Sequence, residues 1–537
     1  MEQLFTYSQK KIVILFLGFI LLLSLTITIS LYANAPNETA GINEGPNCRY
    51  GVATFHETDN PYIDQLNAGW AVNFKGDAIR NLPSDVEYVP IIRITQKRVN
   101  GNRVDDYTLW SPNSFPALGN LIDANPGKLW LVGNEIDRHT AQDDIMPDVY
   151  AKAYHEIYEF IKGRDPSAQV AISALVQVTP GRLQYLDIVW DSYLAKYGTP
   201  MPVDVWNFHV YVLPERRIDG TDSAAAVALG TDPSLAKLES FIPPNGPFLD
   251  CARDDVYCVA EHDDMTIFVE QIIAMRQWMK DHGQQHKPLI LSEFSTLYPY
   301  SQEGDSDPNT CFTKDENGNC FTPARVNQFM NSTFAYLENT KIASLGYPYD
   351  DNKLVQQWLW FAMNQNYIDP IYPPNEISSN KLVDYALNTT MPTNLTAMGN
   401  NFRNHVTNIP AQINLVPLNA SNKVVFGTTS TPISVDILNN GNTTNKTHYN
   451  VTFYSDASLS LGSSIGTAVI TEDLLGCARP TQKAEVTWNG LTPGIHQFWA
   501  KVDNNNNVGE SNESDNVISG YVFVDPPEQV YLPTIQR

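Results

Sequence analysis

Two glutamates stand at the ends of apolar, strand-like runs in this chain of 537 residues. Glu135 closes the run LWLVGNE and Glu293 closes the run PLILSE. A short continuous apolar run is typical of a parallel strand buried on both faces, and the carboxyl ends of barrel strands face the active site. A carboxylate at such a position is costly to bury. Two carboxylates that meet there are the groups that hydrolysis of a glycosidic bond requires, whereas the alternative for each is an ion pair at the rim.

These runs belong to a longer alternation of apolar runs and amphipathic segments. Eight strands are expected, over residues 49–55, 69–74, 88–95, 128–135, 169–178, 203–212, 287–294 and 354–363. Apolar residues recur at three- and four-residue spacing between them, as over 147–162, 263–282 and 323–340. This order is typical of βαβ units around a parallel sheet. We therefore expect an α/β fold in which residues 47–407 form a (β/α)8 TIM barrel.

Polar and aromatic side chains collect at the carboxyl ends of these runs, which favours one shared pocket. Seven of them are expected to bind the substrate: His56, Asn73, Arg93, Asn134, His209, Tyr211 and Trp360. For His56 and His209 a structural role is an equal alternative, and Arg93 could instead pair with Glu293 and hold it ionised. Strand alternation further predicts that Leu289, Leu291 and Glu293 share one side.

The chain resembles clan A glycoside hydrolases, and within that clan it looks most like the endo-β-1,3-glucanase-type catalytic-core family. The matching residues are Asn134-Glu135 in LVGNEID, His209-Val210-Tyr211 in WNFHVYV, Glu293 in ILSEFS, and Trp360. The resemblance implies a retaining glycosidase in which Glu135 is the acid/base, Glu293 the nucleophile and Trp360 a floor for the sugar ring. Ile136 replaces the proline that usually follows Asn-Glu, which leaves the substrate open.

The composition of the chain limits the classes of partner that it can bind. Lys and Arg number 35 against 59 Asp and Glu, for a formal net charge of −24. Binding of nucleic acid requires clustered Lys and Arg, so we expect no nucleic acid as a partner. The resemblance implies a β-linked polysaccharide as substrate, with β-glucan favoured, and we expect neither a cofactor nor a metal ion. The alternative is a catalytically inactive barrel that acts as a cell-wall glycan-binding or adhesion protein.

Residues 1–35 are predicted to be a signal peptide or signal anchor. Lys10 and Lys11 precede an apolar stretch over 12–31, and Ala33 and Ala35 provide a small-residue cleavage pattern. About 20 apolar residues are also enough to span a bilayer if cleavage does not occur. Either outcome predicts an extracellular or cell-surface location, with the membrane touched only by this segment.

Six cysteines fit an oxidising compartment. We expect two local disulfides, Cys251 with Cys258 and Cys311 with Cys320, because the members of each pair lie close together in loop-like segments. Cys48 and Cys477 remain, and their spacing leaves open whether they pair or stay free. No cysteine spacing of the kind that binds zinc occurs.

The C-terminal part has a different pattern. Runs such as HYNVTFYSD and IHQFWAKVD alternate in period two between turn residues, which predicts an immunoglobulin-like β-sandwich over 412–525 and a tail over 526–537. The stretch VDNNNNVGESNESDN resembles part of the cell-adhesion-related domain of bacteria, CARDB, which is often appended to secreted enzymes.

Overall fold

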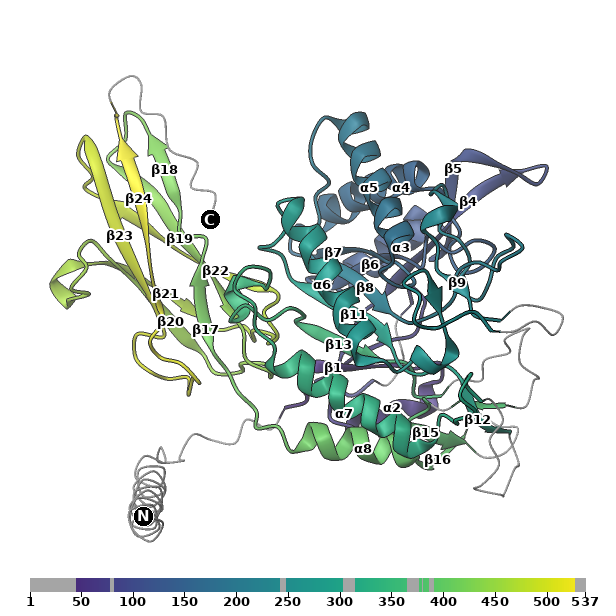
Figure 1. Ribbon diagram of the computed structural model, residues 1–537. Coiled ribbons are helices and arrows are strands. Elements are labelled where there is room, and N and C mark those ends of the chain that lie inside the picture. The colour runs from purple at the N-terminus through teal and green to yellow at the C-terminus, as the bar shows by residue number, and fades with distance from the viewer. Residues whose placement is uncertain are drawn as a thin grey trace, which may run out of the picture. The chain divides into compact units, whose positions relative to one another are not determined.

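The computed structural model describes residues 45–77, 82–241, 248–302, 314–364, 376–378, 380–385 and 391–526 (Figure 1). The N-terminal segment 1–35, its apolar stretch 12–31 and nearly all of the tail 526–537 lie outside the described residues. Among the helices that are described, none has the length and apolar character to cross a membrane.

The part before residue 408 is a mixed α/β structure. Its main strands are β1 (Asn47–Ala53), β2 (Ala68–Val72), β3 (Glu87–Tyr88), β4 (Ile91–Val99), β5 (Asn102–Ser111), β6 (Leu129–Asn134), β7 (Gln169–Ala174), β8 (Trp206–Val210), β11 (Leu289–Phe294) and β13 (Gln357–Trp360). Its helices are α2 (Asn60–Gln65), α3 (Phe115–Ala124), α4 (Pro147–Arg164), α5 (Pro180–Tyr197), α6 (Met265–Asp281), α7 (Pro323–Asn339) and α8 (Ala397–Thr407). Each of the eight expected runs overlaps an observed strand.

Short strands occupy the connecting loops. They form three pairs: β9 (Leu238–Glu239) with β10 (Val256–Tyr257), β12 (Pro299–Gln302) with β14 (Glu376–Ser378), and β15 (Val383–Tyr385) with β16 (Pro392–Leu395). Cys251 and Cys258, which the sequence pairs, form a disulfide beside β10. Cys320 is also disulfide-bonded, and its predicted partner Cys311 lies outside the described residues.

The closed barrel that the pattern predicts is not confirmed. Within the described residues the main strands form two sheets, ordered β3-β2-β1-β13-β11-β8 and β5-β4-β6-β7. Pro90 separates β3 from β4 and has no backbone N–H to continue a ladder, so β3 pairs with β2 while β4 pairs with β6. Between β7 and β8 there is only an isolated bridge, Ala171 with Val205.

The two sheets nevertheless enclose a common core. Inward-facing residues from both sheets pack together, including Val72 of β2, Leu131 of β6 and Leu359 of β13. A larger core lies on the other side of the strands, between them and the helices. Helices α3 to α6 lie outside the strands, and α7 runs beside α8 (Figure 1). Burial on both faces explains why the strands read as continuous apolar runs.

Local signals in the sequence fix where the helices begin. The side chain of Ser114 accepts a hydrogen bond from the first turn of α3, as do Asp264 for α6 and Thr322 for α7. Proline occupies the first position of α4, α5 and α7, where its missing N–H has no partner to lose. The helices therefore start close to the carboxyl ends of the strands, where the polar side chains gather.

The C-terminal part is a β-sandwich. Its strands are β17 (Leu415–Leu418), β18 (Asn422–Val425), β19 (Ser430–Asn439), β20 (Tyr449–Tyr454), β21 (Ser464–Ile470), β22 (Thr481–Asn489), β23 (Gly494–Val502) and β24 (Val517–Val524). They form a three-stranded sheet, β17-β19-β22, and a five-stranded sheet, β18-β24-β23-β20-β21, around a separate apolar core.

Residues at the start of the α/β strands bind the sandwich. Cys48 of β1 and Cys477 form a disulfide with Cα atoms 6.0 Å apart, which resolves the pairing that the sequence leaves open. Arg479 is buried, and it donates to Gln357 of β13, to Gln169 of β7 and to Glu87 of β3. The sandwich is thus tied to the amino ends of the strands, away from the ends that carry the two glutamates.

Candidate active site

The two glutamates predicted from the strand ends come together around one histidine. One carboxylate oxygen of Glu135, one of Glu293 and a ring nitrogen of His209 all lie within 4.8 Å of one another. His209 Nδ1 is 3.2 Å from Glu135 Oε1, and His209 Nε2 is 3.5 Å from Glu293 Oε1. The three side chains are almost fully buried. Each ring nitrogen of the imidazole therefore lies close to one carboxylate.

A β-bulge turns Glu293 toward the site. Leu289 and Leu291 face the outer core beneath the helices, so the predicted shared side of Leu289, Leu291 and Glu293 is wrong. Between Leu291 and Glu293 the register of β11 against β8 shifts by one residue at Ser292, and Glu293 pairs with His209. A bulge of this kind re-aims the side chains that follow it. Without the extra residue, Glu293 would point into the outer core.

Glu135 reaches the site through an unusual backbone conformation. It follows β6 with φ +46°, and Gly133 has φ +98°. Left-handed φ is uncommon for a residue with a side chain and costs of the order of 1–3 kcal/mol. A Cβ on Gly133 would also lie 2.8 Å from Ile136. The strand end is therefore held in a turn that presents the Glu135 carboxylate to His209.

The surroundings of the two carboxylates set their pKa values apart. Burial raises the pKa of Glu293 to about 7, since the charge of His209 and the hydrogen bond from Tyr211 only partly oppose it and the charge of Glu135 adds to it. Burial also acts on Glu135, but the hydrogen bond with His209 and the charge of Arg138 outweigh it and lower the pKa. Without a ligand, Glu293 therefore binds a proton more readily than Glu135 does.

His209 and Tyr211 orient the pair. Burial lowers the pKa of His209, but the charge of Glu293 and the hydrogen bond with Glu135 outweigh burial and raise it. The Tyr211 hydroxyl donates to Glu293 Oε2 at 3.0 Å. His209 Nε2 also lies 3.1 Å from the Ser292 hydroxyl. Trp206, Phe208 and Val210 of β8 face the outer core, so Asn207 and His209, which alternate with them, point to the inner side.

Arg93 and Asn134 are held by a loop after β6. Arg93 Nε donates to Asp143 Oδ1 at 2.7 Å, and both side chains are buried. Gln142 Oε1 accepts from Arg93 and from Asn134. Arg93 forms its ion pair with Asp143 rather than with Glu293, although its charge still acts to lower the pKa of Glu293. Nothing in the sequence run AQDDIM distinguishes Asp143 from its acidic neighbour.

Trp360 does not face the site. It is fully buried among Phe294 and Phe334, and its indole N–H donates to the carbonyl of Asn380. Because no face of this ring is exposed, the prediction that Trp360 forms a floor for the sugar ring must be corrected. The next residue, Phe361, belongs to the inner core. Strand alternation from Leu359, which faces the same core, is the signal that would have selected Phe361.

Asn73 and His56 lie apart from the carboxylates. Asn73 accepts hydrogen bonds from Lys75 N–H and from the Tyr88 hydroxyl, and it donates to the carbonyl of Asp77. It therefore stabilises its own loop. The ring of His56 meets the ring of Tyr385 edge-on, with centroids 6.0 Å apart. The structure brings neither residue into contact with Glu135 or Glu293.

A buried ion network supports the turn after Glu135. Arg182 is fully buried, pairs with Asp137 and contacts Glu215 at 3.0 Å. Arg182 also donates to the carbonyls of Ala225 and Ala226 in the long loop after β8. The side chain of Asp137 is fully buried. The network ties this loop to the segment that carries Glu135.

Two groups of described side chains have donor atoms close enough together to bind a metal ion. One is Glu135, His209 and Glu293, and the other is Cys251, Cys258 and Glu316. The sulfurs of the second group are joined in a disulfide and cannot act as thiolates. In the first group His209 already contacts both carboxylates, which suits proton chemistry without requiring an ion.

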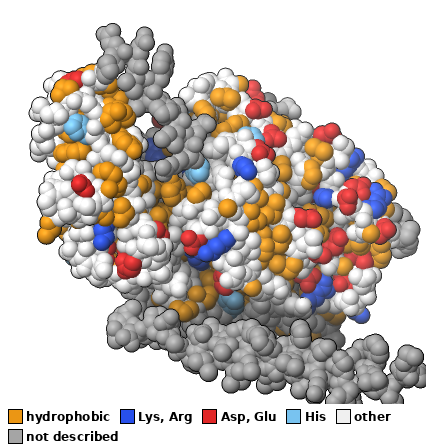
Figure 2. Space-filling model, turned by 60° about the vertical axis from the view of Figure 1, so that its left-hand side comes forward, with side chains coloured by type: hydrophobic (Ala, Val, Ile, Leu, Met, Phe, Trp, Pro, Cys, Tyr) orange, Lys and Arg blue, Asp and Glu red, His pale blue; other side chains and the backbone are white. Residues whose placement is uncertain are grey.

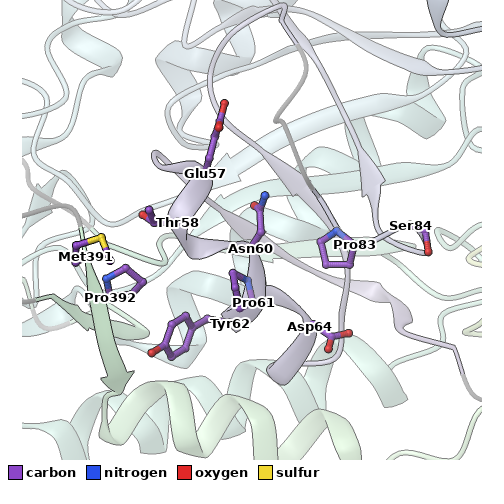
Figure 3. Close-up of a pocket in the computed structure, with 10 residues that line it drawn as sticks. All are labelled: Glu57, Thr58, Asn60, Pro61, Tyr62, Asp64, Pro83, Ser84, Met391 and Pro392. Atoms are coloured by element: carbon purple, nitrogen blue, oxygen red, sulfur yellow. The ribbon is translucent and has the colours of Figure 1, made fainter.

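A separate pocket opens beside α2 (Figure 3). Tyr62, Met391 and Pro392 line one side and Pro83 lines another (Figure 3). Neither carboxylate of the buried pair lines it. On the face shown in Figure 2, Lys and Arg side chains lie among acidic ones and form no continuous basic patch.

Comparison with known proteins identifies the C-terminal part. Residues 413–520 match the CARDB family model, which confirms the CARDB-like domain expected from the sequence. The CARDB domain of a Pyrococcus furiosus protein, solved in complex with di-metal ions, is 21% identical, and the match covers 21% of this chain and 94% of that one with a TM-score of 0.18. None of the curated proteins matches the chain.

Glycoside hydrolases are among the similar solved structures. A β-glucuronidase from Parabacteroides merdae is 9% identical; the match covers 90% of this chain and 48% of that one, with a TM-score of 0.35. A GH128 subgroup VII oligosaccharide-binding protein from Trichoderma gamsii is 12% identical over 70% of this chain and 98% of that one, with a TM-score of 0.35. The chain thus spans about half of the β-glucuronidase, and these neighbours do not identify the predicted glucanase family.

Proposed function

We propose that the chain is a retaining glycosidase that acts on a β-linked polysaccharide, with β-glucan favoured. The observation that carries the proposal is the approach of Glu135 and Glu293, one carboxylate oxygen of each lying within 4.8 Å of the other in a buried site. Retaining enzymes hold their carboxyl groups about 5–5.5 Å apart, whereas inverting enzymes hold them about 6.5–9.5 Å apart to admit water. The spacing therefore favours a double displacement through a covalent glycosyl-enzyme.

In this proposal Glu293 is the nucleophile and Glu135 the acid and then the base. The Tyr211 hydroxyl supports the first role, because its hydrogen bond orients Glu293 Oε2 and leaves the other oxygen to attack. The positive φ of Glu135 supports the second, since it aims the carboxyl from the neighbouring sheet. The raised pKa of Glu293 and the lowered pKa of Glu135 in the ligand-free site run opposite to these roles.

His209 provides the route by which the proton changes place. Its Nε2 faces Glu293 and its Nδ1 faces Glu135. A proton received at Nε2 from Glu293 is matched by one given from Nδ1 to Glu135, so the histidine ends with its original charge. Glu293 is then ionised for attack, and Glu135 carries the proton for the leaving oxygen. A bound sugar that excludes water from Glu135 favours this transfer, because burial penalises its charged form.

Chemical rescue distinguishes the roles. Hydrolysis of an activated aryl β-glycoside is expected to fall by several orders of magnitude in Glu135→Ala and in Glu293→Ala. Azide should restore both, yielding a β-glycosyl azide with Glu135→Ala and an α-glycosyl azide with Glu293→Ala, as NMR of the products would show. Interchanged anomers would reverse the roles, and full activity in either variant would refute the glycosidase. Glu159→Ala, on the exposed face of α4, is the control.

We also propose residues 47–407 as the catalytic domain and 412–525 as the sandwich domain, with export to the cell surface or the medium. The CARDB match and the disulfides support a location outside the cytoplasm, since such bonds persist in oxidising compartments. Sequencing the N-terminus of exported material would show whether cleavage follows Ala35.

A further inference from the structure

Two exposed aromatic rings stand near the ends of β1 and β5, which belong to different sheets. Phe55, two residues after β1, is 43% exposed, and Trp110 near the end of β5 is 46% exposed. Exposed rings of this size are uncommon in a buried neighbourhood, where aromatic side chains contribute most by packing. Both rings have one partner on the protein side and a face left open.

The partner of Trp110 is the guanidinium of Arg93. The Arg93 Cζ atom lies 4.4 Å from the centre of the Trp110 ring. Arg93 cannot easily move, because it is buried and bound to Asp143 and Gln142. A ring with one face closed by a fixed cation and about half its surface exposed has its other face free. The indole is therefore held in place before any ligand arrives.

The partner of Phe55 is Phe74. Their rings stack with centroids 5.6 Å apart and planes at 17°, and Phe361 meets both edge-on. The carbonyl of Phe74 accepts a hydrogen bond from Arg93. Arg93 thus contacts both groups of rings. Its guanidinium lies against the Trp110 ring, and it donates to the carbonyl of Phe74, whose ring stacks on that of Phe55. The two exposed rings belong to one connected rim.

This rim adjoins the carboxylate pair. Phe361 N–H donates to the carbonyl of Phe294, the residue after Glu293. On the other side, the Arg93 charge acts on Glu293, and Asn134 beside Glu135 shares Gln142 with Arg93. Through Arg93, Gln142 and the backbone of Phe361, the rim is therefore connected to the residues that carry the two carboxylates.

We propose that Phe55 and Trp110 are stacking platforms for two further sugar units of a neutral, β-linked glycan chain that extends from Glu293 over β1, β2 and β5. This inference rests on the proposed function and names the ligand of the same site as a chain of several sugars. The axial C–H groups of a β-linked pyranose form a flat apolar face, which suits an open aromatic ring. Neither open ring carries charge, and the Arg93 cation beneath Trp110 is already paired with Asp143, so the two platforms present no unpaired cation to an anionic sugar.

Binding as a function of chain length tests the proposal. The full chain with Glu293→Gln, which removes turnover, is titrated by calorimetry with β-1,3-linked glucose oligomers of two and six units, and with the β-1,4-linked series. Trp110→Ala and Phe55→Ala are each expected to weaken binding of the six-unit oligomer about tenfold, and the two-unit oligomer distinctly less. Trp110→Phe should restore most of the loss, because it keeps a flat ring.

Controls separate a platform from a structural role. Phe426→Ala, which removes a 70% exposed ring from the sandwich, should leave both affinities unchanged. If Trp110→Ala weakened both oligomers equally, the ring would serve only to hold Arg93 and the proposal would fail. It would also fail if neither oligomer series bound the Glu293→Gln chain. Because no step requires turnover, these results are independent of the rescue experiment that tests the glycosidase itself.

Discussion

Replacing Glu293 by glutamine should change how stability depends on pH. Glu293 is fully buried, and its pKa is raised from 4.5 to about 7. A group whose pKa is raised on folding stabilises the fold while it is protonated. Its contribution is fully present below about pH 4.5 and is lost as the pH rises through about 7. The gap between the two values corresponds to about 3 kcal/mol of unfolding free energy.

Urea denaturation at intervals between pH 4.5 and 8.5 measures this effect. Glutamine keeps the shape of the side chain and an oxygen for the Tyr211 hydroxyl, but it does not ionise. The unfolding free energy of Glu293→Gln should therefore gain about 3 kcal/mol relative to the parent across this range. Glu159→Gln on the surface of α4 should show no such trend. A difference between Glu293→Gln and the parent that stays constant with pH would refute the reasoning.

Two further predictions concern the scaffold. Arg182→Met should lower the unfolding free energy by about 3–5 kcal/mol, because it leaves Asp137 and Glu215 buried without their cation; a urea midpoint equal to that of the parent would contradict this. Cys48→Ser combined with Cys477→Ser should cost about 2–5 kcal/mol, because the disulfide closes a very long loop; calorimetry would show a lower melting temperature, and an unchanged one would contradict the expectation.

The sequence predicts the strands well, because strands that are buried on both faces appear in it as continuous apolar runs. Every expected run overlaps an observed strand, and the prolines at the first positions of α4, α5 and α7 mark helix starts. The break in the barrel is harder to foresee. Pro90 lies inside one expected run, and only the structure shows that the ladder changes partner there.

The direction of individual side chains is where sequence patterns fail. Simple alternation places Leu291 and Glu293 on one side, yet the bulge at Ser292 turns them to opposite cores. Alternation from Leu359 selects Phe361, whereas the family resemblance points to Trp360, which faces the outer core. A bulge depends on how two strands pair, and the identity of the bulged residue carries little of that information.

The candidate site lies at the junction between the four-stranded and the six-stranded sheet, which we call the seam. Glu135 follows β6 of the four-stranded sheet, whereas His209 and Glu293 lie on β8 and β11 of the six-stranded sheet. Where β7 meets β8 the backbones share one isolated bridge and a few hydrogen bonds, so side chains must hold the sheets in place.

The contact between His209 and Glu135 crosses this seam, and so does the ion network through Arg182, which joins the segment after β6 to Glu215 beyond β8. Opening of the seam would separate Glu135 from Glu293 while each strand stayed folded. The distance between the two carboxylates, on which the proposed retaining mechanism depends, is therefore set by buried polar contacts between the sheets more than by either sheet alone.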